Sequence, residues 1–234
     1  LSVSNIFSQR GWFWQNPYPM GVDLENCFFV NNETGFAIGR KGNILKTTNS
    51  GSSWRYLNAG CVNYLSSIYF INSFTGFAIS GDRNLPANNI LLKTTNSGES
   101  WNEISIFNNS QLSCIKFINE YTGFIVGGRY WYGGYIFKTI DGGNNWIQYP
   151  QLETNFMNSI YFTSYDTGYV AGDDGKILKT TNCGSNWIFL NTGNNYTGFY
   201  SITFINAQTG YVVGGGGKIY MTSNSGNNWI EQSS

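Results

Sequence analysis

Hydrophobic and polar positions in this 234-residue chain alternate in the manner of β-strands. Short apolar runs such as residues 65–71 and 35–38 end at polar turns rich in Asn, Thr and Gly. A partly alternating run is typical of a strand with one covered face, and a continuous apolar run is typical of a strand covered on both faces. No segment combines a helical period with capping residues. The pattern therefore predicts an all-β protein.

The apolar runs belong to a unit that occurs five times. Each unit closes with the phrase Thr-x-Asn/Asp-x-Gly-x-Ser/Asn-Trp, here called the box, whose tryptophans recur every 41 to 47 residues. A Thr-Gly-Phe/Tyr phrase precedes each box, and one phenylalanine precedes that phrase. A period of 40 to 50 residues indicates a repeat architecture. The boxes comprise Thr47, Asn49, Gly51, Trp54; Thr94, Asn96, Gly98, Trp101; Thr139, Asp141, Gly143, Trp146; Thr180, Asn182, Gly184, Trp187; and Thr222, Asn224, Gly226, Trp229.

Each unit contains enough strand-like segments for four antiparallel strands. The box makes the hairpin turn into the fourth strand, because Asn or Asp can accept bonds from backbone amides ahead of it and Gly supplies a positive φ. A single four-stranded unit of this size cannot bury the apolar faces of its sheet. Several units bury these faces against one another when they pack around an axis as blades. The sequence therefore predicts a five-bladed β-propeller. Its repeats are expected near residues 21–60, 61–109, 110–154, 155–197 and 198–234.

The N-terminal region requires its own interpretation. Residues 10–17 resemble the end of a box, with Gly11 and Trp14 in register with Gly51 and Trp54. We expect them to form an outermost strand that latches onto the last blade, so that residues 10–234 make one domain. Residues 1–9 are interpreted as the remnant of an export signal. The alternative is that the chain is a piece of a larger propeller.

Composition excludes several classes of function. Thirteen basic residues balance thirteen acidic ones, so the chain lacks the positive field of a general nucleic-acid binder. The absence of histidine excludes imidazole catalysis, and no apolar run reaches the ~20 residues of a membrane-spanning helix. No CxxC pair occurs, so we expect neither a metal nor a cofactor. Spacing forces no disulfide among Cys27, Cys61, Cys114 and Cys183.

The box resembles the Asp-box, or bacterial neuraminidase repeat. The whole unit is similar to the propellers of the photosystem II stability and assembly factor-like group, and residues 14–21 resemble the start of such domains in secreted bacterial proteins. The resemblance covers about residues 10–232. It implies a non-enzymatic, secreted, periplasmic or cell-surface bacterial protein that binds a protein partner. The arginine cluster and Tyr/Glu pair that sialidases of this group require have no counterpart here.

Candidate binding residues lie where the repeat is interrupted. Units two and three carry long loops between their second and third strands, at residues 81–89 and 128–134. In a propeller these loops share the face opposite the boxes, here called the loop face, and neighbouring blades bring them together. Arginine and exposed aromatics are typical of protein hot spots and of sugar-stacking platforms. The candidates are Asp82, Arg83, Arg129, Tyr130, Trp131 and Tyr132.

Each of these features also has a plainer interpretation. The long loops could fold their aromatics inward, and we weigh this equally with binding. The boxes could hold calcium through Asn and Asp oxygens, but four of the five have Asn at the Asn/Asp position and only Asp141 is acidic there, which favours a structural turn. We predict that a protein of an envelope or extracellular complex docks on the loop face. The alternative is a carbohydrate-binding or glycoside-hydrolase-like propeller that uses the same face.

Overall fold

In the computed structural model, the described residues form five four-stranded antiparallel sheets, one for each repeat. The structure describes residues 23–61, 63–81, 89–107, 111–129, 133–149, 156–193 and 197–233. Every sheet has its strands in the order of the chain, which confirms the predicted four-stranded blades. The prediction of an all-β, five-bladed propeller is therefore confirmed.

The blades are numbered along the chain. Blade 1 comprises β1 (Leu24–Phe29), β2 (Gly35–Gly39), β3 (Asn43–Thr47) and β4 (Arg55–Asn58). Blade 2 comprises β5 (Leu65–Phe70), β6 (Gly76–Ser80), β7 (Asn89–Thr94) and β8 (Asn102–Phe107). Blade 3 comprises β9 (Gln111–Phe117), β10 (Gly123–Arg129), β11 (Gly133–Thr139) and β12 (Ile147–Gln148). Blade 4 comprises β13 (Met157–Phe162), β14 (Gly168–Gly172), β15 (Ile177–Thr180) and β16 (Ile188–Leu190). Blade 5 comprises β17 (Phe199–Phe204), β18 (Gly210–Gly214), β19 (Ile219–Thr222) and β20 (Ile230–Glu231).

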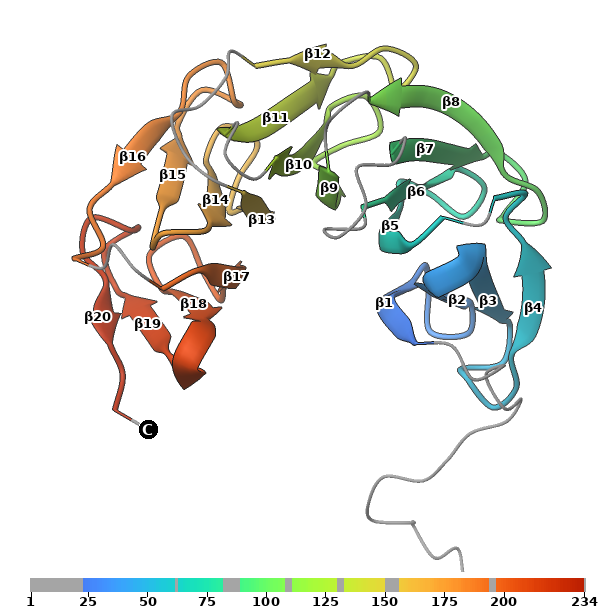
Figure 1. The fold of residues 1–234 in the computed structure, drawn as a ribbon, viewed down its shortest axis with the longest axis horizontal. Coiled ribbons are helices and arrows are strands. Elements are labelled where there is room, and N and C mark those ends of the chain that lie inside the picture. Colours follow the sequence, from blue (N-terminus) through green and yellow to red (C-terminus); the bar gives the residue numbers. More distant parts are fainter. Residues whose placement is uncertain are drawn as a thin grey trace, which may run out of the picture.

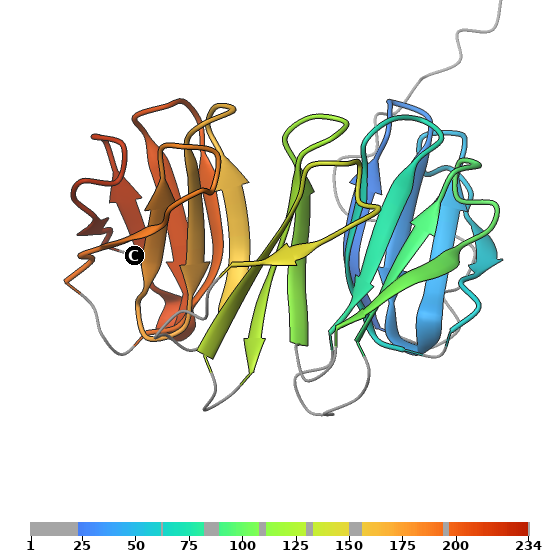
Figure 2. The same cartoon turned by 90° about the horizontal axis from the view of Figure 1, so that it is seen from above.

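The blades are arranged along an arc around a common centre (Figure 1), with the first strand of each blade innermost and the fourth strand outermost. Their strands run along the axis of the arc, so the sheets stand face to face (Figure 2). First strands of neighbouring blades contact one another from β1 to β17. Blades 5 and 1 are separated by an opening in Figure 1. The predicted latch strand at residues 10–17 lies outside the described residues.

Neighbouring blades pack through stacked pairs of aromatic rings. The first-strand phenylalanine of each blade stacks on the second-strand aromatic of the blade before it. The centroid distances are 4.3 Å for Phe70 on Phe36, 4.9 Å for Phe117 on Phe77, 4.7 Å for Phe162 on Phe124 and 4.2 Å for Phe204 on Tyr169. Offset stacking of this kind adds to the free energy of apolar burial. The two aromatic columns seen in the sequence are thus the two sides of the blade interface.

The glycine of the Thr-Gly phrase is required by this packing. A Cβ at Gly76 would lie 2.6 Å from the Phe70 ring, because the ring covers the backbone of the neighbouring strand. The box tryptophan of the same blade meets this phenylalanine edge-on, as Trp101 meets Phe70 at a centroid distance of 5.9 Å. Phenylalanine, glycine and tryptophan therefore recur together because they form one contact.

Third-strand lysines link each blade to the next. The Lys46 ammonium donates to the Ser97 carbonyl at 2.7 Å, and the Lys179 ammonium donates to the Ser225 carbonyl at 2.7 Å. Lys93 and Lys138 make the same contact with the boxes of blades 3 and 4. Each ammonium therefore caps a backbone carbonyl in the neighbouring box while its stem crosses an apolar surface.

Candidate functional site

The loop of blade 3 sits on a long hairpin. Strands β10 and β11 pair from Gly123 opposite Thr139 to Arg129 opposite Gly133. The pairing in blade 4 is shorter, since β14 and β15 pair only from Gly168 to Ala171. The paired part of the blade 3 hairpin is therefore longer than that of the blade 4 hairpin. Arg129, partly buried at the end of β10, is the predicted site residue that the structure describes. Asp82, Arg83, Tyr130, Trp131 and Tyr132 lie outside the described residues.

The two enlarged loops start from one place. Gly81 directly follows β6, and Gly127 lies near the end of β10. Both glycines pack against the first residues of β9. A Cβ on Gly81 would lie 1.7 Å from the Leu112 carbonyl oxygen, and a Cβ on Gly127 would lie 1.9 Å from the Gln111 carbonyl oxygen. Only glycine allows the backbone to approach this closely. The structure thus brings the bases of the loops together on either side of residues 111–112.

The base of the blade 3 loop packs closely against the start of blade 4. A Cβ on Gly128 would lie 2.9 Å from the Cα of Phe156, the buried residue that leads into blade 4. Gly128 therefore has no room for a side chain, and the first side chain that the hairpin can present is that of Arg129. A binding site carried on such a base would be held rigidly by the blades on both sides.

Other charged groups on the loop face are used to connect blades. The Asn158 side-chain amide donates to the Asp173 carboxylate at 2.9 Å and to the Phe199 carbonyl of blade 5 at 2.7 Å. The Arg40 guanidinium pairs with Asp23 at 3.3 Å and lies over the Tyr64 ring. Asp173 and Asp174 are adjacent acids in the sequence, and the Asp173 carboxylate accepts from the amide that links blades 4 and 5.

The threonine and asparagine side chains of the box turns form hydrogen bonds within the turn. In blade 2 the Gly98 amide donates to the Thr94 hydroxyl oxygen at 2.9 Å, and the Thr94 hydroxyl donates to Asn96 Oδ1 at 2.9 Å. Asn96 Oδ1 also accepts from the Ser100 amide at 3.0 Å. The equivalent threonine and glycine are bonded in the same way in the other boxes. These side chains are therefore occupied by the turn itself.

Asp141 is the carboxylate at the Asn/Asp position of the boxes. Its pKa is lowered to about 2, because the Asn145 amide, the Asn145 side chain and the Thr139 hydroxyl donate to it. Asparagine makes the corresponding bonds in the other boxes, so the turn does not depend on a charge. Among the residues that the structure describes, no three metal-binding side chains come together.

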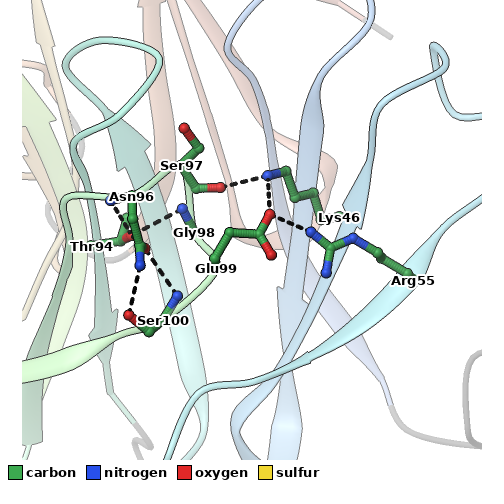
Figure 3. Close-up of polar contacts among 8 residues, drawn as sticks. All are labelled: Lys46, Arg55, Thr94, Asn96, Ser97, Gly98, Glu99 and Ser100. Atoms are coloured by element: carbon green, nitrogen blue, oxygen red, sulfur yellow. Dashed lines mark hydrogen bonds and ion pairs between the residues drawn. The ribbon is translucent and has the colours of Figure 1, made fainter.

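Glu99 is a departure at the box end that the sequence analysis did not single out. Figure 3 shows its carboxylate between two cations of blade 1, Lys46 and Arg55. Lys46 Nζ lies 2.7 Å from Glu99 Oε1, and the Arg55 guanidinium donates to the same oxygen. These hydrogen bonds, first from Arg55 and then from Lys46, lower the Glu99 pKa. The other boxes have Ser or Asn here, so comparing the boxes column by column would have revealed it.

The box end also exposes large apolar side chains. Phe74, Tyr121 and Tyr165 lie in the turns between first and second strands, and Ile140 lies in the blade 3 box. The two kinds of turn share one end of the blade, since the Ser97 amide donates to the Phe74 carbonyl at 2.9 Å. This surface was missed because the residues are single departures in otherwise polar turns.

Comparison with known proteins supports the fold and relates the chain to one family. The family model described as photosynthesis system II assembly factor YCF48 matches residues 95–234. A structure of YCF48 bound to a D1 peptide has 17% sequence identity and a TM-score of 0.52, over 91% of this chain and 81% of that chain. No curated protein sequence matches significantly.

Solved structures of GH74 enzymes are similar in fold. The enzyme from Niastella koreensis has 18% identity and a TM-score of 0.69, over 89% of this chain and 38% of that chain. An ancestral GH74 enzyme has 19% identity and a TM-score of 0.73, over 95% of this chain and 33% of that chain. This chain thus spans about a third of their length. Within the described residues, no helix is long and apolar enough to cross a membrane.

Proposed function

Because the chain belongs to the family of photosynthesis system II assembly factor YCF48, we propose that it is a non-enzymatic propeller that binds a protein partner on its loop face. The observation that carries this proposal is the meeting of the two enlarged loop bases at residues 111–112. A relative of this family has been solved with a bound peptide, which supports protein recognition as the task. The D1 peptide itself is not carried over to this chain.

The two ends of the blades differ in what they leave available for a partner. At the box end, the Thr and Asn side chains of the turns bond to their own backbone. The loops of blades 2 and 3 are extra to the repeat and include Arg83 and Trp131. Aromatic and arginine side chains on a rigid base bind with little loss of conformational entropy, which is typical of hot spots.

We place the partner in an envelope or extracellular complex of a bacterium. The support for this is the resemblance of residues 14–21 to the start of propeller domains in secreted bacterial proteins, together with the low content of charged residues, 11% of the chain. We propose a protein partner because loops that carry arginine and aromatic residues in a neutral chain bind proteins by apolar burial rather than by long-range charge.

To test this proposal, the tagged protein is used to capture its partner from an extract of the source organism. We expect a stoichiometric protein that is retained by the wild type and lost from the double variant Arg129→Ala/Trp131→Ala. The matched control is Tyr165→Ala, which removes an exposed aromatic from the box end. Retention of the partner by the double variant, or its loss in the control, would show that the loop face is not the docking surface.

A second candidate is recognition or cleavage of a glycan on the same loops. The fold similarity to GH74 enzymes favours it, although identities of 18% and 19% concern the fold alone. Binding of a soluble polysaccharide that Trp131→Ala abolishes would support recognition, and turnover of aryl glycosides would support catalysis. If neither polysaccharide binding nor glycoside turnover is observed, protein binding remains the proposed function of the loop face.

A further inference from the structure

The turn between the first and second strands is built in the same way in all five blades. These turns lie at the box end of the molecule (Figure 2), and the residue before each Thr-Gly phrase forms the apex of the turn. In every blade the carbonyl of this residue accepts a hydrogen bond of 2.9 Å from an amide of the box. The five equivalent residues, here called the apex residues, are Glu33, Phe74, Tyr121, Asp166 and Gln208.

The turn does not depend on the side chain at its apex. In blade 2 the Asn72 side-chain oxygen accepts from the amide of the apex residue and from the amide after it, and Asn119 does the same in blade 3. The apex side chain is exposed in all five blades. Phe74 is 63% exposed and Tyr121 is 60% exposed, so folding does not explain why these two positions are aromatic.

The apex residues form an ordered series along the arc. Blades 2 and 3 carry the two aromatic rings, and the blades on either side of them carry the carboxylates of Glu33 and Asp166. Neighbouring blades are joined at this end, as the Lys93 ammonium of blade 2 donates to the Gly142 carbonyl in the box of blade 3. The series thus places two exposed rings between two exposed carboxylates.

Blade 3 adds groups of both kinds to the centre of the series. Glu120 directly precedes Tyr121 and is exposed. The Gly142 amide donates to the Tyr121 carbonyl, which places the blade 3 box beside this turn. That box carries Ile140, which is 67% exposed, and the ionised Asp141. Apolar and acidic side chains therefore occur together at the box end of blade 3.

The turns at the box end contain acids and no bases. Neither lysine nor arginine occurs in the first-to-second strand turns at 31–34, 72–75, 119–122, 163–167 and 205–209, or in the box segments at 48–53, 95–100, 140–145, 181–186 and 223–228. The lysines of the third strands donate to box carbonyls between blades. Among the residues that the structure describes, no lysine or arginine forms an ion pair with Glu33, Glu120 or Asp166. These three carboxylates therefore favour a ligand of positive charge.

Exposed aromatic rings beside carboxylates bind a particular kind of ligand. The face of a ring attracts an ammonium or guanidinium group, and a carboxylate forms a charge-assisted hydrogen bond with the same group. Apolar side chains of a ligand would cover the rings themselves. A nucleic acid or an anionic lipid surface has the wrong charge for these acids. A polypeptide with basic and apolar side chains supplies both kinds of contact.

We propose that Phe74 and Tyr121, with Glu33 and Asp166 on either side, bind a protein segment in which lysine or arginine residues flank apolar residues. The apolar side chains of the segment cover the two rings, and its basic side chains reach the carboxylates of blades 1 and 4. This surface lies at the opposite end of the blades from the loop face. The proposal therefore concerns a second partner and does not depend on what the loop face binds.

The first test selects ligands without assuming their sequence. The full chain is used as bait for a random peptide library displayed on phage, and the selected peptides are compared on the wild type and on Phe74→Ser/Tyr121→Ser. We expect peptides in which basic residues flank apolar ones, with affinities that fall roughly tenfold or more in the double variant. The matched control Gln208→Ser changes the exposed apex residue of blade 5 and should leave these affinities unchanged.

Two results of this selection would overturn the proposal. One is that no selected peptide combines basic with apolar residues. The other is that such peptides bind the double variant or the loop-face variant Arg129→Ala/Trp131→Ala in the wrong order, with the loop-face variant losing them and the box-end variant retaining them. The changed box-end residues are exposed, so the Tm of each box-end variant should equal that of the wild type and loss of folding does not obscure the result.

The second test separates charge from apolar contact. Glu33→Gln/Asp166→Asn keeps the size of both side chains and removes their charges, so the affinity of the selected peptides should fall and should depend less on salt. Unchanged affinity and unchanged salt dependence would contradict the proposal. Concentration-dependent association of the chain that is abolished both by Phe74→Ser/Tyr121→Ser and by Arg129→Ala/Trp131→Ala would also overturn it. Such association would show that the loop face of a second copy occupies this surface.

Discussion

The box end and the loop end of the blades are built by the same strands, but they differ in how closely the repeats agree. At the box end the same threonine hydroxyl accepts the same glycine amide in every box. At the loop end blades 2 and 3 have long loops, whereas blades 1 and 5 have tight 3-10 turns, η1 (Arg40–Gly42) and η2 (Gly215–Gly217). Strict agreement marks residues that the shared fold uses, and we propose that the departures at the loop end serve binding.

The tight turns show what the loop end needs for structure alone. Lys41, Asp174 and Gly216 occupy the same turn position with φ of 58°, 56° and 67°, and each is followed by a glycine of positive φ. A three-residue turn with this geometry is sufficient to connect the second and third strands. The longer loops of blades 2 and 3 are therefore not required for blade formation.

The largest effect is expected in the aromatic column between blades. Phe117→Ala removes a ring that stacks on Phe77 and leaves a cavity, so unfolding should cost about 3–5 kcal/mol less. The matched control is Phe29→Ala, whose ring is half exposed and should contribute clearly less. Urea denaturation monitored by tryptophan fluorescence measures both. Equal losses would show that blade 1 is covered in solution by something that packs as blade 2 does.

A smaller loss is expected when one box loses its central hydroxyl. Thr94→Val keeps the shape of the buried side chain but leaves the Gly98 amide without its acceptor, which should cost about 1–3 kcal/mol. Thr95→Val changes the exposed neighbour and should have little effect. Chemical denaturation compares the two variants. If both are neutral, the box is not the structural turn that its repeated hydrogen bonds indicate.

The ion pair of Glu99 should add a pH-dependent contribution. Because its folded-state pKa is lowered, the stabilisation is present above the unfolded pKa near 4.5 and is lost as the pH falls through the folded pKa. The carboxylate is half exposed, so the contribution should stay below about 1 kcal/mol. Glu99→Gln should therefore lower the Tm at pH 7 and not at pH 3. A constant difference across this range would exclude charge as the cause.

Much of the architecture was predicted from the sequence, because one blade is specified locally. The Phe, Thr-Gly and Trp columns identified the strands and the turns, and the adjacency of the two long loops followed from neighbouring blades. Contacts between blades were not predicted in detail. The Lys46–Ser97 and Glu99–Arg55 contacts depend on how blades are staggered, which no pattern within a repeat specifies. The opening of the arc depends on the angle between blades, which the number of repeats does not fix.

The smallest effect on stability is expected from the exposed apolar residues of the box end, and it tests the comparison most directly. Phe74→Ser and Tyr121→Ser replace exposed side chains in turns, so each should change the free energy of unfolding by no more than about 0.5 kcal/mol. Recovery of the protein partner should also be unchanged, because the proposed docking surface lies at the opposite end of the blades. If these variants lose the partner while Arg129→Ala/Trp131→Ala retains it, recognition belongs to the apolar turns of the box end. The single departures within strictly repeated turns would then be the functional signal, and the long loops of blades 2 and 3 would serve another purpose.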